Sequence, residues 1–348
     1  MNSLYLQKDS RWKSCPGIGS RAMASHFAWI AGTVMICIFS RSGVAQTNEQ
    51  RAQAATATAN TAAACMALPK FYWEVGDRDG VLVSGALGSS PPTASTLMNV
   101  FSASKWIYGA YVYQRRNGVL TSDDLRSVRL LDGYTQTSAC ATQSTVGACY
   151  SAMGVQDTAA IDKFFYASGH FQKHAAVDLG LADKTRSTLA TEIHNYLGDD
   201  WTFTYARTDL AGGGNSSAAE YSKFLRKILN GTLLLSGGAL GSDAVCTYTG
   251  PTDPVSGRVN CASAAGPASG EAWSYSIGHW VENDPVWLAN GGDAAYSSPG
   301  LAGFYPWIDA SRTYYGILAR TDLSEGAGGA SAACGRLIRK AWLTAVPQ

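Results

Sequence analysis

The stretch that decides the fold reads Asn99-Val-Phe-Ser-Ala-Ser-Lys-Trp-Ile-Tyr-Gly-Ala-Tyr-Val-Tyr113. An apolar, β-branched approach leads to Ser102, and a run with the apolar character of a helix follows it. Ser102 and Lys105 are three positions apart, so on a helix both side chains point to one face. A serine hydroxyl is a weak nucleophile that needs a base, and a lysine can serve when desolvation or a nearby cation lowers its pKa. The stretch therefore predicts a catalytic pair in which Lys105 activates Ser102.

The spacing alone is weak evidence, because the segment Ser10-Arg-Trp-Lys13 has the same spacing and no expected function. In the simpler interpretation, Ser102 caps a helix and Lys105 is a solvated side chain. The rest of the chain has to decide between these two interpretations.

Residues 1–45 are typical of a secretory signal peptide. Basic residues precede an apolar run at 27–39, and Gly43-Val-Ala45 supplies small residues at a cleavage site. We expect cleavage after Ala45 and a secreted or periplasmic protein; Met23 is an alternative start, and an uncleaved anchor is the alternative fate. Residues 46–65 are predicted to form a polar linker with some helical character.

The composition and the net charge indicate an ordinary globular protein and bear on its partners. The 348 residues are 46% hydrophobic and 15% charged, as in an ordinary globular protein. Without residues 1–45, which hold five basic residues and one acidic one, the net charge changes from +1 to about −3. No basic patch remains, so we expect no nucleic-acid partner. We also expect no stable membrane partner after cleavage, and the oligomeric state stays open.

Six cysteines remain after residue 45, and an even number in an exported chain predicts disulfides. Fifteen connectivities are open, and free buried thiols are the alternative. Proximity in the sequence favours two pairs and leaves a third: Cys140–Cys149, Cys246–Cys261 and Cys65–Cys334. No C-x-x-C occurs, and the histidines of His170-Phe-Gln-Lys-His174 lack the glutamate of H-E-x-x-H. We therefore expect no metal and no cofactor.

The order of predicted elements places strands at both ends of the chain and helices between them. Alternation predicts a hairpin at 69–87, and strands at 273–280, 304–308 and 314–320. Helices are predicted at 158–167, 171–180, 187–197, 218–230 and 330–343, with Ser122 or Asp123 capping a further helix. This order predicts an α+β fold.

Several segments of the sequence resemble motifs of the serine β-lactamase and penicillin-binding-protein family. This family includes D-Ala-D-Ala peptidases, esterases and amide-oligomer hydrolases. The segments are Phe101-Ser-Ala-Ser-Lys105, Asn117-Gly-Val-Leu-Thr-Ser-Asp-Asp124 and Ala211-Gly-Gly-Gly-Asn-Ser-Ser-Ala-Ala-Glu-Tyr221. The resemblance implies an antiparallel sheet built from both chain ends, with flanking helices and an inserted helical domain. It implies one catalytic unit at 66–348, whose α/β part is about 66–105 and 270–348 and whose helical part is about 106–269.

The family's second motif, Ser-x-Asn or Tyr-x-Asn, supplies a proton shuttle. Tyr166-Ala-Ser-Gly-His170 is the first candidate: Ser168 would carry the shuttle hydroxyl, and His170 would stand where asparagine is usual and contact substrate. Tyr166 is an alternative shuttle, and Tyr205 is a further candidate that would line the substrate site. In the simpler interpretation these side chains are packing tyrosines or a capping serine.

The third motif, normally Lys-Thr-Gly or His-x-Gly, is matched by Ser298-Pro-Gly300. Gly300 would let the backbone approach substrate, and the N–H groups of Leu301 and Ser102 would form the oxyanion hole. Ser298 would contact substrate where the family has a cation that binds a carboxylate. That departure favours a neutral ester or amide substrate.

We therefore expect a secreted serine hydrolase that acts on a small or oligomeric ester, amide or lactam through a covalent acyl-enzyme. A β-lactamase or D-Ala-D-Ala carboxypeptidase is the alternative within this class. A catalytically silent protein that binds cell wall or ligand is the alternative from another class.

Overall fold

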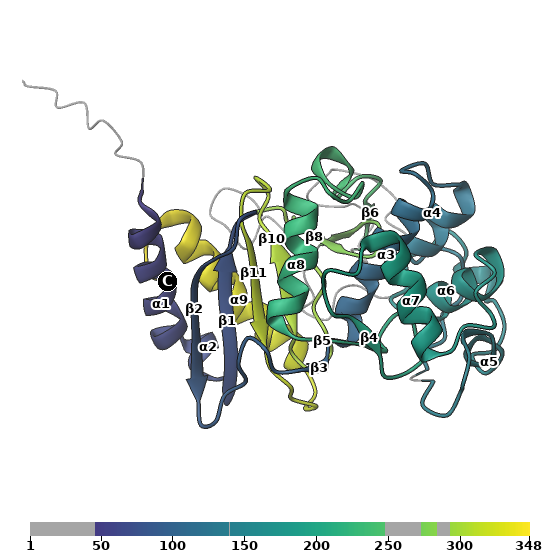
Figure 1. Ribbon diagram of the computed structural model, residues 1–348, viewed down its shortest axis with the longest axis horizontal. Helices are drawn as coiled ribbons and strands as arrows, with labels where there is room; N and C mark the ends of the chain where they lie inside the picture. The colour runs from purple at the N-terminus through teal and green to yellow at the C-terminus, as the bar shows by residue number, and fades with distance from the viewer. Residues whose placement is uncertain (1–45, 139, 248–272, 284–292) are drawn as a thin grey trace, which may run out of the picture. The chain divides into compact units, whose positions relative to one another are not determined.

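Strands from both ends of the chain share one antiparallel sheet (Figure 1). The computed structural model describes residues 46–138, 140–247, 273–283 and 293–348. Within the described residues the sheet has eight strands, in the order β2-β1-β11-β10-β9-β8-β7-β6. The strands are β1 (Lys70–Gly76), β2 (Val81–Gly88), β6 (Val245–Cys246), β7 (Ser274–Tyr275), β8 (Trp280–Glu282), β9 (Ala295–Ser297), β10 (Tyr305–Ile308) and β11 (Tyr315–Ala319). The predicted sheet built from both chain ends is confirmed.

Strand β1 joins the two chain ends within the sheet. It pairs with β2 through the predicted hairpin and with β11 on its other side, with Trp73 opposite Leu318. All of its residues after Lys70 are buried, as expected for a strand covered on both faces. A small second sheet consists of β3 (Met98–Asn99), β5 (Gly214–Ser216) and β4 (Thr204–Tyr205).

The helices cover both faces of the large sheet and build a separate helical region (Figure 1). They are α1 (Asn48–Thr61), α2 (Ala63–Met66), α3 (Ser104–Arg115), α4 (Ser122–Val128), α5 (Val146–Ser151), α6 (Gly169–Lys173), α7 (Arg186–Leu197), α8 (Ala218–Leu229) and α9 (Ala327–Thr344). Helix α8 contacts β11, so residues 218–229 belong with the sheet although they were predicted to lie in the helical insertion.

The segment at 46–65 is part of the fold, which contradicts its prediction as a linker. It forms α1 and α2 and belongs to the same compact unit as the rest of the chain to Gln348. Ala55 and Ala59 are fully buried, and Nη1 of Arg51 donates to the last carbonyl groups of α9, those of Trp342 and Leu343. The small alanine side chains permit close helix packing. The polar composition of the segment gave no indication of this packing.

Two local predictions fail for physical reasons. Residues 158–167 were predicted as a helix, but only Thr158–Ala160 form a 3-10 turn, and the chain then runs irregularly to α6. The cap of α4 is Thr121, not Ser122 or Asp123, because Thr121 and Asp124 form a reciprocal capping box.

Helix α3, which follows Ser102, packs by its backbone against the turn between β7 and β8. A Cβ atom at Gly109 would clash with the carbonyl group of Ile277, and one at Gly278 would clash with the carbonyl oxygen of Lys105. Gly278 also has a φ of 71°, which favours glycine. The start of α3 is therefore fixed against the sheet.

His279 in that turn supports α3 with a neutral ring. Its ring stacks on Trp106 at 5.4 Å between centroids, Nδ1 donates to the Ile277 carbonyl group, and Nε2 accepts from the Gly241 N–H. Full burial lowers the pKa of His279 to about 4. The ring thus serves as donor and acceptor at once, which only the neutral form can do.

Two disulfides lie in the described part of the chain, Cys65–Cys334 and Cys140–Cys149, as predicted. The first joins α2 to α9 and so links the two ends of the described chain covalently. Cys246 is disulfide-bonded, and its predicted partner, Cys261, lies outside the described residues.

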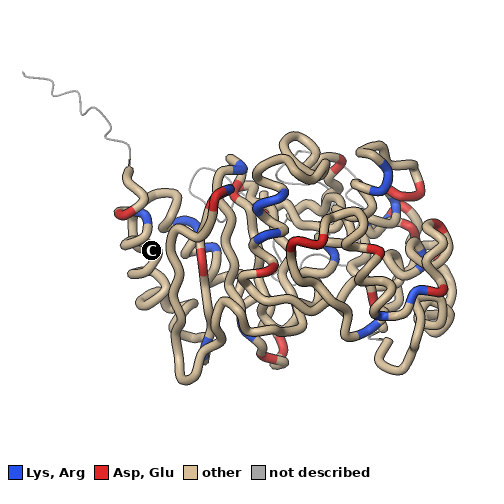
Figure 2. Tube along the Cα trace, viewed as in Figure 1, with Lys and Arg blue, Asp and Glu red and all other residues tan. Residues whose placement is uncertain are grey.

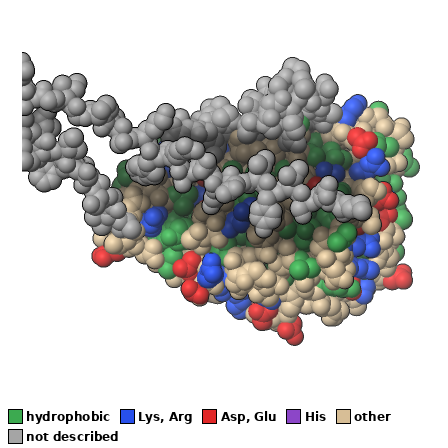
Figure 3. Space-filling model, turned by 90° about the horizontal axis from the view of Figure 1, so that it is seen from above, with side chains coloured by type: hydrophobic (Ala, Val, Ile, Leu, Met, Phe, Trp, Pro, Cys, Tyr) green, Lys and Arg blue, Asp and Glu red, His purple; other side chains and the backbone are tan. Residues whose placement is uncertain are grey.

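Charged residues of both signs are interspersed along the described chain (Figure 2). The face seen in Figure 3 likewise carries scattered basic and acidic side chains among hydrophobic ones. Among the described helices, none combines the length and apolar character needed to cross a bilayer.

We expect the Cys65–Cys334 disulfide to stabilise the fold more than Cys140–Cys149, because they span 269 and 9 positions of the chain. In the chain-entropy model the difference is about 3 kcal/mol. Urea unfolding of the two double Cys→Ser variants measures it. Equal losses in the two variants would contradict the expectation.

We expect acid to destabilise the fold through His279. The unfolded chain binds a proton near pH 6.5 whereas the folded chain does so only near 4, so stability falls as pH falls through this window. The loss at pH 4 is about 3 kcal/mol.

Unfolding free energies of the wild type and His279→Gln between pH 7 and 4 measure the effect, because glutamine can both donate and accept. The stability difference between the two proteins should change across this range, and a constant difference would refute the assignment.

Candidate active site

Ser102 lies in a tight 3-10 turn, Phe101–Ala103, that leads directly into α3. Phe101 has a φ of 47°, a left-handed conformation that is unusual for a bulky residue. The Asn99 side-chain oxygen accepts from the Phe101 N–H at 2.8 Å and helps to hold this conformation. Strained residues of this kind concentrate at functional sites. The turn leaves Ser102 only half-buried.

Lys105 contacts Ser102 as the spacing predicted. Lys105 Nζ lies 3.0 Å from Ser102 Oγ and 3.0 Å from the carbonyl oxygen of Ala211. Its side chain is 4% exposed, so it is not the solvated lysine of the simpler interpretation. A buried amino group needs acceptors, and these two contacts supply them. The arrangement places an amino group within hydrogen-bond distance of a serine hydroxyl group.

Of the three candidates for the proton shuttle, Tyr166 is the one that contacts Lys105. Its ring centroid lies 4.6 Å from Lys105 Nζ, and the ring also stacks on Trp280. Ser168 is buried at the start of α6 and has no hydrogen bond to Lys105 in the described structure. Tyr166 is thus the candidate whose side chain adjoins Lys105.

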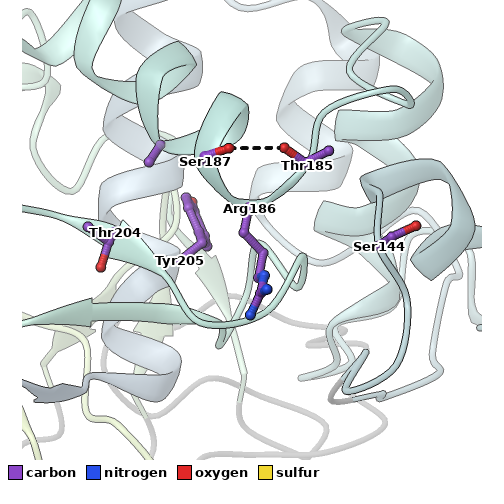
Figure 4. Close-up of a pocket in the computed structure, with 7 residues that line it drawn as sticks. Ser144, Thr185, Arg186, Ser187, Thr204 and Tyr205 are labelled. Carbon is purple, nitrogen blue, oxygen red and sulfur yellow. Dashed lines mark hydrogen bonds between the residues drawn. The ribbon is translucent and has the colours of Figure 1, made fainter.

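Tyr205 is a buried residue whose hydroxyl group interacts electrostatically with Asp209. It lines a hollow between α7 and β4 with Ser144, Thr185, Arg186 and Thr204 (Figure 4). The Tyr205 hydroxyl is buried without a hydrogen-bond partner among the described residues, and burial raises its pKa. No hydrogen bond or ring contact in this part of the structure joins it to Ser102 or Lys105, so the predicted role in substrate binding gains no support.

His170 is an interior residue, which contradicts the prediction that it contacts substrate. Its side chain is fully buried, Nδ1 bonds to the Asp132 carboxylate, and Nε2 bonds to the Phe165 carbonyl oxygen at 3.0 Å. His170 holds the chain directly before Tyr166. Spacing alone could not reveal the partner Asp132, 38 positions earlier.

The third predicted motif lies against the backbone of Ser102. Ser298 Oγ donates to the Ser102 carbonyl oxygen at 2.8 Å, and the side chain is 1% exposed. Ser298 thus contacts the backbone of Ser102, and its buried hydroxyl group is already engaged in this hydrogen bond. A Cβ atom at Gly300 would clash with the Val100 carbonyl oxygen, which explains why glycine is required there. The adjacent Leu301 is 63% exposed.

Asp209 is a buried acid beside this pair that the sequence reasoning missed. Burial raises the pKa of its carboxyl group, while the nearby Lys105, backbone N–H groups and Arg207 oppose that rise. Asp209 Oδ1 accepts from the Ala211 N–H at 2.9 Å, and the Ala211 carbonyl oxygen accepts from Lys105. Asp209 is therefore a positioning residue for Lys105. Its signal in the sequence was a lone acid directly before an apolar, glycine-rich turn.

No group of three or more His, Cys, Asp or Glu side chains in the described ranges could hold a metal ion. The side chains that the structure brings together at the site are those of Ser102, Lys105 and Tyr166.

No protein-family model and no curated protein sequence matches this chain. Solved structures do match it. EstCE1, described as a hydrolase with promiscuous acyltransferase activity, is 11% identical over 85% of this chain and 99% of its own, with a TM-score of 0.58. An octameric penicillin-binding protein homologue from Pyrococcus abyssi is 12% identical over 86% and 77%, with a TM-score of 0.56.

A D-amino acid amidase from Ochrobactrum anthropi SV3 is 10% identical over 86% of this chain and 98% of its own, with a TM-score of 0.51. At these identities the matches establish the fold alone. The chain has the β-lactamase and penicillin-binding-protein fold, as the sequence predicted.

We expect Asp209→Asn to retain most activity and Asp209→Ala to lose it. Asparagine can still accept from the Ala211 N–H, whereas alanine leaves that buried donor unpaired and frees the Ala211 turn. Loss of such a bond costs about 1–3 kcal/mol, or roughly 5- to 150-fold in kcat. Steady-state kinetics of both variants test this. Equal losses would mean that the charge of Asp209, not its hydrogen bond, acts on Lys105.

Proposed function

We propose that this protein is a serine hydrolase that cleaves an ester or amide through an acyl-enzyme on Ser102. The observation that carries the proposal is the 3.0 Å contact between Lys105 Nζ and Ser102 Oγ, with Lys105 almost fully buried. A solvated lysine or a simple helix cap would need neither the burial nor the contact.

In the proposed first step, Ser102 Oγ attacks the substrate carbonyl carbon while Lys105 Nζ, in its neutral form, accepts the hydroxyl proton. The carbonyl oxygen becomes an oxyanion, which the N–H groups of Ser102 and Leu301 would stabilise. The intermediate then collapses, the bond to the leaving group breaks, and the leaving group takes the proton from Lys105, directly or through Tyr166.

In the second step, water attacks the acyl group and gives up a proton to the same base. Ser102 Oγ leaves as the hydroxyl group, and the acid product is released. Tyr166 is proposed as the proton shuttle because its ring contacts Lys105.

The buried hydroxyl of Ser298 favours an ester or amide over a β-lactam or a D-Ala-D-Ala peptide. The position where the resembling family has a cation holds a neutral side chain that already donates to the Ser102 carbonyl oxygen. We also propose that the protein is exported. The two disulfides of the described chain fit an extracellular protein, and N-terminal sequencing of the secreted product tests for cleavage after Ala45.

A panel of p-nitrophenyl esters, anilides and a chromogenic β-lactam tests the proposal. We expect ester hydrolysis in the wild type and a loss of roughly 100- to 10,000-fold in kcat for Lys105→Met, because methionine keeps the shape of the side chain without its base. Tyr166→Phe should lower kcat far more than Ser168→Ala.

Ester hydrolysis that persists in Lys105→Met would refute the mechanism. Turnover of the β-lactam with none of the esters would favour a β-lactamase. A folded wild-type protein without turnover of any substrate would favour the silent binding protein.

A further inference from the structure

Gln172 on α6 is a fully buried amide whose two polar atoms are both bonded to backbone groups. Its Nε2 donates to the carbonyl oxygen of Val146 at 3.0 Å and to that of Thr208 at 2.9 Å. Its Oε1 accepts from the Leu210 N–H at 3.3 Å. Only this orientation of the amide matches its donors to carbonyl groups and its acceptor to an N–H group. Gln172 therefore links α6 to the start of α5 and to the segment before β5.

Two of these three bonds lie in the Ala211 turn, residues 208–211. The carbonyl oxygen of Ala211 accepts from Lys105 Nζ at 3.0 Å, and Asp209 accepts from the Ala211 N–H inside the turn. In the described chain, Gln172 and Lys105 are the two side chains from outside the turn that bond to its backbone. Asp209 thus shapes the turn from within, and Gln172 anchors it to the helical region.

Helix α6 also anchors the segment of the second neighbour of Lys105. His170, on the same helix, bonds through Nε2 to the carbonyl oxygen of Phe165 at 3.0 Å, directly before Tyr166. The ring centroid of Tyr166 lies 4.6 Å from Lys105 Nζ. The Ala211 carbonyl group and the Tyr166 ring, which both contact Lys105, are therefore next to residues that α6 holds in place.

We propose that Gln172 is a positioning residue for Lys105. It holds the Ala211 turn where the carbonyl group accepts from Nζ, and so keeps the amino group directed at Ser102 Oγ. The inference rests on the proposed function, in which Lys105 accepts the proton of Ser102. Without the Gln172 bonds the turn is free to shift. Such a shift affects proton transfer more than substrate binding, because proton transfer needs the two atoms at hydrogen-bond distance.

Three variants separate a positioning role from a stabilising one. Gln172→Met keeps the length of the side chain and removes all three hydrogen bonds. Gln172→Glu keeps the size and the acceptor for the Leu210 N–H, so it carries the test if the methionine variant does not fold. Lys227→Met is the matched control. It removes a buried side chain of α8 that donates to the Leu197 carbonyl oxygen at 2.7 Å and, within the described chain, has no hydrogen bond to the Ala211 turn.

Steady-state kinetics with a p-nitrophenyl ester, on proteins shown to be folded by circular dichroism, give the first readout. We expect Gln172→Met to lower kcat roughly 10- to 100-fold and to change KM less than about threefold. Gln172→Glu should lose less, and Lys227→Met should keep the wild-type kcat within about twofold. A side chain that only stabilised the fold would lower the unfolding free energy and leave the kcat of the folded protein unchanged.

Reductive methylation of lysines with formaldehyde and borohydride gives a second readout, which does not require turnover. The Lys105 side chain is 4% exposed, so it should react slowly in the wild type. Peptide mass spectrometry should find Lys105 modified about fivefold faster or more in Gln172→Met, because the amino group is then less firmly held by its acceptors. In Lys227→Met the rate at Lys105 should match the wild type.

An unchanged kcat in the folded Gln172 variants, or an equal loss in Lys227→Met, would overturn the proposal. Failure of the proposed function is a separate outcome, in which no ester is hydrolysed or hydrolysis persists in Lys105→Met. The methylation rates then decide: faster modification of Lys105 in Gln172→Met alone supports the positioning role, and equal rates in Gln172→Met and the wild type overturn it.

Discussion

The constraint on which the site depends is the burial of the Lys105 amino group. An amino group removed from water must find acceptors inside the protein. Here they come from Ser102 Oγ on its own helix and from the Ala211 carbonyl group, 106 positions away. The site therefore forms only when the turn before β5 is held against the start of α3.

That requirement explains much of the surrounding structure. The pairing of β3 with β5 places Asn99 opposite Asn215, so the segment before Ser102 and the segment after Ala211 are joined by backbone hydrogen bonds. Ser104 Oγ accepts from the Gly214 N–H, and Tyr221 on α8 donates to the Ala103 carbonyl oxygen. The position of the Lys105 amino group thus depends on tertiary contacts and not on helix geometry alone.

Features that depend on a local pattern of residues could be predicted from the sequence. Features that depend on partners far away in the chain could not. The three-residue spacing of Ser102 and Lys105, the 69–87 hairpin and the closing helix follow from periodicity within a short window. His170 can be buried because it bonds to Asp132. Asp209 acts on Lys105 through the hydrogen bonds of Ala211. No spacing rule predicts such contacts. The polar residues of α1 led to its prediction as a linker, although its alanines pack against the rest of the fold.

Peptide-level mass spectrometry of the acyl-enzyme tests the central claim most directly. The protein is mixed with an activated ester, quenched with acid within the first turnover and digested. The account predicts one acyl group per chain on the peptide that contains Ser102, and none in Ser102→Ala. An acyl group on another residue of the wild type, with Ser102 unmodified while ester is hydrolysed, would contradict it.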